Sequence, residues 1–105
     1  MKRGEIWWAE FVTPAGRRPV LLLSRDEAYM VRELVTVAPI TTRIRNIPSE
    51  VPLDLEDGLP KPCVINLDTV TTITKSILSD RLTALSVKKI KAVETALRFA
   101  LGMES

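Results

Sequence analysis

Helical spacing of apolar residues occurs in one segment of this 105-residue chain, near its end. The apolar side chains there recur every three or four residues, at Val87, Ile90, Val93, Leu97 and Leu101. Ser86 stands where an N-cap belongs, and Gly102 stands where a helix commonly ends. Leu85 is placed to form a hydrophobic staple with Ile90. We therefore predict an amphipathic helix over 87–101, which leaves the preceding residues to build the rest of the fold.

The segments before this helix have the character of short strands separated by turns. Stretches rich in β-branched and aromatic residues alternate with clusters of Pro, Gly and Asp. We predict strands over 5–11, 19–24, 34–40, 50–55, 63–67, 70–74 and 77–82. Turns or loops are predicted over 13–16, 41–48 and 56–62, and a short turn of helix or a loop over 26–30. We expect the segment 77–82 to pair with the two strands that precede it.

Three of these strands contain residues that indicate how the strand is packed or where it lies in the sheet. Val20–Leu23 is apolar at every position, which is typical of a strand covered on both faces, and Pro19 is tolerated at its start. Pro39 indicates that the next strand ends or bulges near Thr41, and Pro52 is typical of an edge strand. Several short strands followed by one helix favour a mainly β (α+β) fold, a small, strongly curved β-barrel with a C-terminal α-helix.

The length and composition are those of one globular domain, which we expect to span residues 1–105. Hydrophobic residues make up 46% of the chain and charged residues 27%, which excludes a mainly disordered protein. No unbroken apolar run approaches the roughly 20 residues that a membrane helix needs. The N-terminal sequence enters a strand without an apolar signal segment, so we expect no membrane association and a cytoplasmic location.

Several kinds of catalytic site are absent from the sequence. The chain contains no histidine, so the usual acid/base at neutral pH and the commonest metal ligand are both missing. Cys63 is the single cysteine, so it completes neither a disulfide nor a zinc site, and we expect a small buried side chain. Asp54, Glu56 and Asp57 lie on a proline-rich turn, where a solvated loop is favoured over a cation site. We expect neither a metal nor a cofactor.

Two short phrases place polar groups at the ends of buried strands. Arg17-Arg18 precedes the strand that begins at Pro19, and Thr41-Thr42 follows the strand that ends at Ile40. Such strand ends are positions from which a rigid scaffold presents side chains to a ligand.

The basic residues are concentrated near the same two phrases. Residues 1–47 hold eight Lys/Arg against five Asp/Glu, although the net charge of the whole chain is only +2. Arginine suits phosphate because its planar fork donates two parallel hydrogen bonds. If the strand ends meet, the arginines form one patch, at Arg17, Arg18, Arg25, Arg43 and Arg45. Scattered surface arginines are an equally ordinary explanation, so the charge alone leaves nucleic-acid binding open.

Four phrases occur in an order and at a spacing that resemble one protein family. They are Arg3-Gly4-Glu5-Ile6-Trp7, Arg18-Pro19-Val20-Leu21-Leu22-Leu23-Ser24, Val37-Ala38-Pro39-Ile40-Thr41-Thr42 and Val51-Pro52-Leu53. From Arg3 to about Leu82 the pattern is similar to the MazF/PemK family of toxin endoribonucleases from bacterial toxin–antitoxin pairs. The resemblance implies an SH3-like β-barrel of the plasmid-maintenance-toxin type, a homodimer, and cleavage of single-stranded RNA at short sequences without a metal.

The resemblance also implies which residues are catalytic. The arginine before the family's proline falls on Arg18, and the hydroxyl residue that closes the Pro-Ile-Thr phrase falls on Thr41. In this reaction the RNA 2′-hydroxyl attacks the adjacent phosphorus and leaves a 2′,3′-cyclic phosphate and a 5′-hydroxyl. Arg18 is expected to neutralise the developing charge with two donors, and Thr41 to donate a third hydrogen bond to a non-bridging oxygen.

Further residues are expected to bind the RNA. In the family one strand and nearby loops recognise bases, and Asp68 stands where relatives carry an acidic residue that accepts from a base edge. Cys63 and Thr69 depart from the Ser and Gln that relatives often carry, and the first turn is short, so the cleavage sequence is not transferable. Trp7 or Trp8 is expected to stack on an unpaired base, and whichever faces inward fills the core. The RNA-binding candidates are Arg17, Thr42, Arg43, Arg45, Asp68 and Trp7.

Partners and alternatives follow from the same resemblance. It implies a cognate antitoxin whose acidic, partly disordered tail lays carboxylates and apolar side chains over an arginine-lined groove. Two other functions remain open: a non-enzymatic toxin of a related family that binds a protein such as DNA gyrase, and a simple nucleic-acid-binding module with an SH3-like barrel. The module predicts salt-sensitive binding without strand scission. Neither alternative depends on Thr41, whereas the nuclease does.

Overall fold

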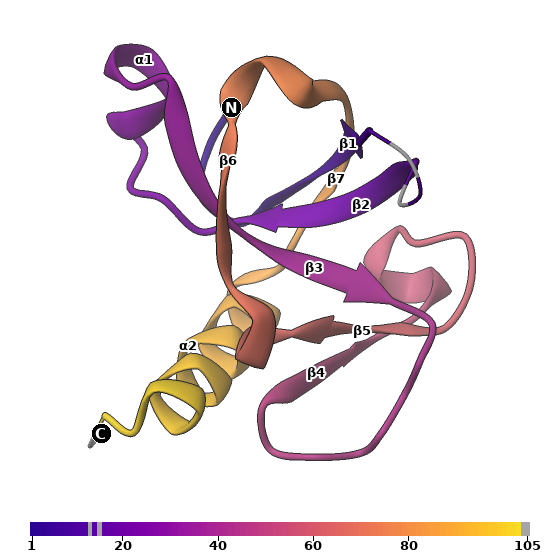
Figure 1. Cartoon of the computed structure of the whole chain (residues 1–105). Helices are drawn as coiled ribbons and strands as arrows, with labels where there is room; N and C mark the ends of the chain where they lie inside the picture. Colours follow the sequence, from indigo (N-terminus) through magenta and orange to yellow (C-terminus); the bar gives the residue numbers. More distant parts are fainter. Residues whose placement is uncertain (13, 15, 104–105) are drawn as a thin grey trace.

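The computed structural model describes residues 1–12, 14 and 16–103, whose arrangement is shown in Figure 1. Its strands are β1 (Glu5–Glu10), β2 (Arg17–Leu22), β3 (Leu34–Thr41), β4 (Glu50–Leu53), β5 (Cys63–Asn66), β6 (Thr71–Thr74) and β7 (Leu78–Ala84). Its helices are α1 (Ala28–Val31) and α2 (Val87–Leu101), with short 3-10 turns η1 (Leu55–Asp57), η2 (Leu67–Thr69) and η3 (Lys75–Ile77). The predicted strands and helices are confirmed with slightly shifted bounds. The predicted turn at 13–16 includes residues 13 and 15, which lie outside the described residues.

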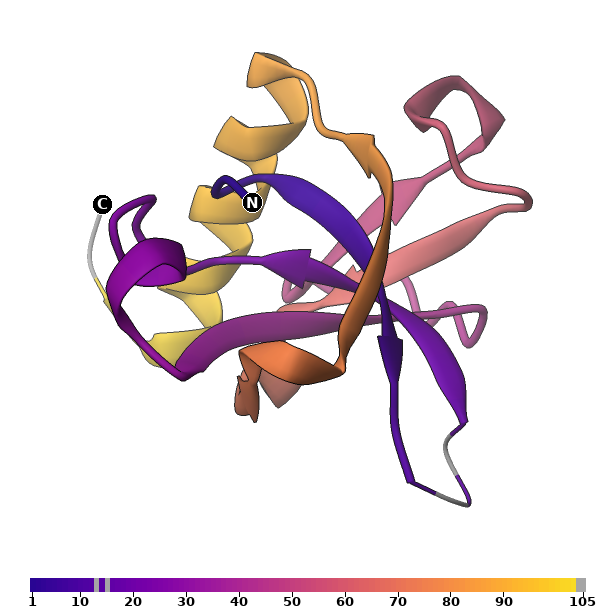
Figure 2. The same cartoon turned by 90° about the horizontal axis from the view of Figure 1, so that it is seen from above.

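The strands form one curved antiparallel sheet in the order β4-β5-β3-β2-β1-β7, and β6 also pairs with β3. β3 is the central strand in Figure 1. It pairs with β2 along one edge, and with β6 and then β5 along its other edge. Residues 34–37 pair with β6, and residues 40–41 pair with β5. Figure 2 shows that the β1–β2 hairpin extends away from α2.

The predicted barrel is confirmed in its roughly barrel-like curvature, but the sheet does not close. Over the described residues β4 pairs with β5 alone and β7 with β1 alone, so these two strands stand at opposite ends of the order. The end position of β4 agrees with the prediction from Pro52, whose side chain is exposed.

The predicted pairing of the segment 77–82 with its two preceding strands is wrong. β7 pairs with β1 instead, with Asp80 opposite Trp8 and Leu78 opposite Ala9. The physical reason is the turn η3, which separates β6 from β7, together with burial of Leu78 in the same core as Ala9. Burial of this side chain outweighs the general tendency of consecutive strands to pair.

Two hydrophobic cores lie on the two faces of the sheet. Leu21 and Ala38 belong to the core that packs against Val93 and Ala96 of α2. The second core contains Val20, Leu22, Val35, Val37 and Tyr29. Because alternate residues of β2 enter different cores, the strand is apolar at both parities, and the prediction that it is covered on both faces is confirmed.

The ends of α2 agree with the sequence. The Ser86 hydroxyl accepts a hydrogen bond from the Lys89 backbone N–H at 3.2 Å, and Gly102 ends the helix at a φ of 70°. Lys89 stands in the first turn, where a cation opposes the helix dipole. Its Nζ donates to the Pro52 carbonyl at 2.6 Å and lies 3.7 Å from an Asp57 oxygen, so it ties the helix start to β4 and η1. None of the helices in the described residues has both the length and the apolar character of a membrane span.

Gly58 ends η1 and is expected to tolerate no side chain. Its φ is 93°, and a Cβ built on it would lie 2.5 Å from the Thr83 hydroxyl oxygen. Gly58→Ala is therefore expected to lower the free energy of unfolding by about 1–3 kcal/mol, because strain and a clash combine. Denaturant unfolding measures this free energy. The matched control is Gly102→Ala, because the φ of Gly102 is also positive, at 70°, but a Cβ built there meets no atom within 4 Å. Equal losses in the two variants would contradict the clash.

Candidate functional site

A cleft of about 390 Å³ opens where β1, β2 and the end of β3 meet the segment 59–63. It is lined by Trp8, Arg17, Arg18, Pro19, Ile40, Thr41, Thr42, Leu59, Pro60, Lys61 and Cys63. Both catalytic candidates, Arg18 and Thr41, therefore lie in the same cleft, together with the RNA-binding candidates Arg17 and Thr42. Three cationic side chains among the lining residues, with Lys61 as the third, suit a polyanionic ligand.

The pairing of β2 with β3 explains why Arg18 and Thr41 line the same cleft. The last hydrogen-bonded pairs of β2 and β3 place Val20 opposite Pro39. Beyond this pair, Arg18 remains opposite Ala9 of β1, whereas Thr41 pairs with Val64 of β5. Pro19 has no backbone N–H, so it cannot donate a further hydrogen bond to the ladder beyond Val20. The two phrases are thus adjacent in space although 23 residues separate these positions in sequence.

Thr41 is held from two sides. Its backbone pairs with Val64 of β5, and its Oγ1 accepts a hydrogen bond from the Arg43 backbone N–H at 3.1 Å. A hydroxyl has two acceptor lone pairs and one donor. This contact uses an acceptor position, and the O–H remains suited to donate to a bound oxyanion.

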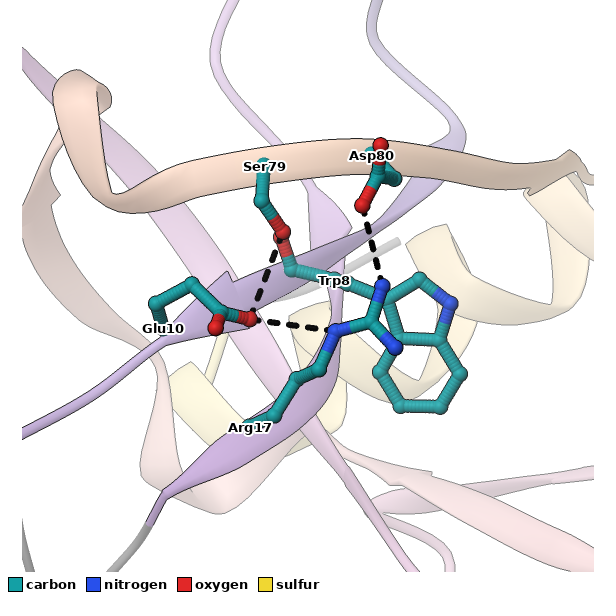
Figure 3. A network of polar contacts seen from close by, with 5 residues as sticks. All are labelled: Trp8, Glu10, Arg17, Ser79 and Asp80. Atoms are coloured by element: carbon teal, nitrogen blue, oxygen red, sulfur yellow. Dashed lines mark hydrogen bonds and ion pairs between the residues drawn. The ribbon is translucent and has the colours of Figure 1, made fainter.

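Arg17 belongs to a polar network at the edge of the cleft, shown in Figure 3. Its Nε donates to Glu10 Oε2 at 3.1 Å and its Nη2 to Asp80 Oδ2 at 3.0 Å. The guanidinium carbon lies over the Trp8 ring, 4.5 Å from its centroid. Ser79 Oγ donates to the same Glu10 oxygen at 3.3 Å. Residues of β1 and β7 thus hold this arginine of β2 in place beside the cleft.

The structure separates the remaining RNA-binding candidates from the cleft. Trp7 packs against the second core, and its Nε1 donates to Glu5 Oε1 at 3.0 Å, whereas Trp8 lines the cleft. Asp68 is exposed in η2, and one of its carboxylate oxygens accepts from the Ser49 hydroxyl. Neither Trp7 nor Asp68 is among the residues that line this cleft.

Arg43 and Arg45 lie on the exposed loop that follows β3, also outside the cleft lining. Arg45 Nε donates to Glu50 Oε2 at 3.2 Å, and its backbone N–H donates to Glu50 Oε1 at 2.9 Å. The Glu50 side chain is only 2% exposed. Because a buried carboxylate needs a paired cation, Arg45 has a structural role in holding this loop.

Sequence reasoning did not identify part of the cleft. The sequence predicts only a long turn for Leu59, Pro60 and Lys61, and nothing in their spacing shows that this turn lines the same cleft as Arg18. The one available signal is the flanking of Lys61 by two prolines, which gives a cation a rigid position. Glu10 and Asp80 carry no local signal, because their common partner, Arg17, becomes their neighbour only through the pairing of β1 with β2 and β7.

Cys63 is buried in the cleft wall, as expected, with 5% of its surface exposed. Burial raises the pKa of its thiol, and the Asp57 and Asp54 carboxylates raise it further. The folded chain favours the protonated thiol. The contribution of Cys63 to stability is therefore full below pH 9.0, which is the ordinary pKa of a thiol, and it is lost as the pH rises through the higher pKa of the folded state.

A test of this environment is alkylation by iodoacetamide, because only the thiolate reacts. Below pH 9.0 the native protein is expected to react much more slowly than the unfolded chain, and its rate is expected to keep rising above that pH. Mass spectrometry of timed samples measures both rates. Equal rates in native and unfolded protein would contradict a buried thiol with a raised pKa.

Comparisons with known proteins show the family of this chain. A family model described as PemK-like, MazF-like toxin of type II toxin-antitoxin system matches residues 2–101. The chain is 42% identical over 100 residues to "Probable endoribonuclease MazF5" of Mycobacterium tuberculosis, with 94% of this chain and 91% of that protein covered.

Solved structures are similar over the same extent. The Mycobacterium tuberculosis toxin MazF-mt6 matches with a TM-score of 0.88 at 33% identity, over 96% of this chain and 99% of that chain. A mycobacterial endoribonuclease in complex with its cognate antitoxin also matches with a TM-score of 0.88, at 27% identity over 100% of this chain and 98% of that chain. The resemblance found in the four sequence phrases is confirmed, and the chain belongs to the family of PemK-like, MazF-like toxins of type II toxin–antitoxin systems.

Proposed function

We propose that this chain, an endoribonuclease toxin of a toxin–antitoxin system, cleaves single-stranded RNA in the cleft with Arg18 and Thr41 as its catalytic residues. The observation that supports the proposal is that both line one cleft, just beyond Val20 and Pro39, which form the last pair between β2 and β3. Arg17 and Lys61 line the same cleft, and Lys61 adds positive charge for the RNA backbone.

The proposed reaction uses the nucleophile that RNA already contains. The 2′-oxygen loses its proton and forms a bond to the adjacent phosphorus, and the bond from phosphorus to the 5′-oxygen breaks. The products are a 2′,3′-cyclic phosphate and a 5′-hydroxyl, whose oxygen has gained a proton. Negative charge accumulates on the non-bridging oxygens during this exchange, so groups that bind these oxygens lower the barrier.

Arg18 and Thr41 fit two parts of this task. An arginine side chain stays charged at neutral pH and donates two parallel hydrogen bonds, so Arg18 acts by electrostatic stabilisation rather than as an acid. Thr41 supplies a hydroxyl donor from a position fixed by Val64 and by the Arg43 backbone. No group of three or more His, Cys, Asp or Glu side chains that could hold a metal ion occurs in the described residues.

We further propose the partners and setting of the reaction. The chain acts as one domain over residues 1–105, as a homodimer, in the cytoplasm. A homodimer extends a cleft of about 390 Å³ into a groove for several nucleotides. An antitoxin with an acidic, partly disordered tail inhibits it by placing carboxylates against the cationic cleft. The complex of a similar endoribonuclease with its cognate antitoxin supports such a partner.

The first experiment is incubation of the purified protein with a long single-stranded RNA in EDTA, followed by mapping of the ends. Discrete cuts that end in a 2′,3′-cyclic phosphate, and that disappear in Arg18→Ala and Thr41→Ala, are the expected result. Binding without cleavage would favour the nucleic-acid-binding module instead. Neither binding nor cleavage across diverse RNAs would favour the toxin that binds a protein such as gyrase.

A further inference from the structure

We propose that the exposed face of the Arg17 guanidinium is a stacking surface for an unpaired nucleobase, with Glu10 and Asp80 as its positioning residues. The inference rests on the proposed function in one respect, namely that single-stranded RNA occupies the cleft. It adds a division of roles within the cationic cleft: Arg17 binds a base, whereas Arg18 and Lys61 bind phosphate.

Strand pairing brings the network together on one face of the sheet. Glu10 is directly opposite Arg17 on β2, and Trp8 is directly opposite Asp80 on β7. Trp8 and Glu10 are two residues apart on β1, so their side chains project from the same face. The guanidinium therefore lies over the Trp8 ring between two carboxylates, as Figure 3 shows.

The hydrogen bonds leave a planar face available. Guanidinium N–H groups donate in the plane of the group, and Glu10 and Asp80 occupy two of the five. The Trp8 ring covers one side of the guanidinium. The Arg17 side chain is nonetheless 48% exposed and lines the cleft, so part of it remains accessible to a ligand there. Arginine planes are among the surfaces on which unpaired RNA bases stack.

The charges favour a base over a phosphate at this position. Two carboxylates surround one guanidinium, so the formal charge of the trio is negative, and a phosphate near it meets repulsion from both carboxylates. A nucleobase is uncharged and meets no such cost. Each ion pair is exposed and individually weak, with the Glu10 side chain 54% and the Asp80 side chain 69% exposed. Both carboxylates and the ring are needed together to keep the guanidinium in one orientation.

The test compares two probes of equal charge by fluorescence anisotropy. One is a short 2′-O-methyl oligoadenylate, in which the nucleophilic hydroxyl is blocked, and the other is an abasic oligomer with the same number of phosphates. The wild-type protein is expected to prefer the oligoadenylate by about tenfold, the order of one stacked base. Arg17→Lys keeps the charge but removes the plane, and it is expected to abolish most of this preference while binding of the abasic probe persists. The matched control is Arg81→Lys, whose arginine is 51% exposed and paired with Glu5.

The double variant Glu10→Gln/Asp80→Asn tests the positioning role. It is expected to reduce the preference for oligoadenylate and to strengthen binding of the abasic probe, because the carboxylates no longer orient Arg17 or repel phosphate. An undiminished preference in Arg17→Lys would overturn the stacking surface. If the double variant bound both probes more tightly and kept the wild-type preference, the positioning role would be overturned. The carboxylates would then act only by repelling phosphate.

Cleavage of unmodified RNA is measured separately with the same protein samples. A wild-type protein that prefers oligoadenylate through Arg17 but cuts no RNA would contradict the proposed function and leave the stacking surface intact. A wild-type protein that cuts RNA but binds both probes equally would contradict the stacking surface alone. Thermal melting of each variant confirms that it is folded.

Discussion

Arg18→Ala is expected to lower kcat/KM for cleavage of single-stranded RNA by about 10²- to 10³-fold, the usual cost of losing a donor to a developing oxyanion. The loss is expected mainly in kcat, because the charge that Arg18 stabilises is largest in the transition state. A fluorogenic oligonucleotide that spans a mapped cut site measures both constants. Arg18 is exposed at the start of β2, so the melting temperature is expected to change little.

Two variants make this result specific to the position. Arg18→Lys keeps a positive charge but loses the planar fork, and it is expected to recover only part of the lost rate. Arg98→Ala removes an exposed arginine of α2, outside the cleft, and is expected to cleave like the wild type. A cleavage rate in Arg18→Ala within a few-fold of the wild type would remove Arg18 from the catalytic assignment.

Thr41→Val is expected to lower kcat/KM by about 10²-fold, because valine keeps the branched shape but cannot donate a hydrogen bond. The pairing of this residue with Val64 involves backbone groups and is expected to persist, so the variant should remain folded. Thr41→Ser restores the hydroxyl and is expected to cleave within a few-fold of the wild type. Single-turnover kinetics at saturating protein separates this chemical effect from any loss of RNA affinity.

The serine variant decides how the valine result is interpreted. If Thr41→Ser were as slow as Thr41→Val, the methyl group and the packing at the end of β3 would matter, and the hydroxyl would have no special role. If both variants cleaved normally, the stabilisation assigned to Thr41 would have to come from another donor in the cleft, such as the neighbouring Thr42.

Local signals in the sequence were sufficient for the helix and for the two central strands. Ser86 and Gly102 act on their own helix ends, so the bounds of α2 follow from residues within one turn. The apolar run Val20–Leu23 needs cover on both faces whatever its neighbours are, and two cores supply it. These features depend on the residues themselves and on burial, not on which distant segment provides the contact.

Features that depend on distant pairing were not predictable. Nothing near Leu78 in the sequence shows that its strand pairs with β1, and the open ends of the sheet follow from such pairings. For the site, the phrases around Arg18 and Thr41 identified two residues that line the same cleft. Adjacent tryptophans point to opposite faces of a strand, but the sequence alone did not show that Trp8, rather than Trp7, would face the cleft.

The network around Arg17 also has a temporal consequence, because its parts leave the ribosome far apart in time. Arg17 and Asp80 are separated by 63 residues in sequence, and they become neighbours only when β7 pairs with β1. Contacts between such distant residues form late in folding. A nascent chain therefore lacks one of the two carboxylates that contact Arg17 until most of the chain has been synthesised.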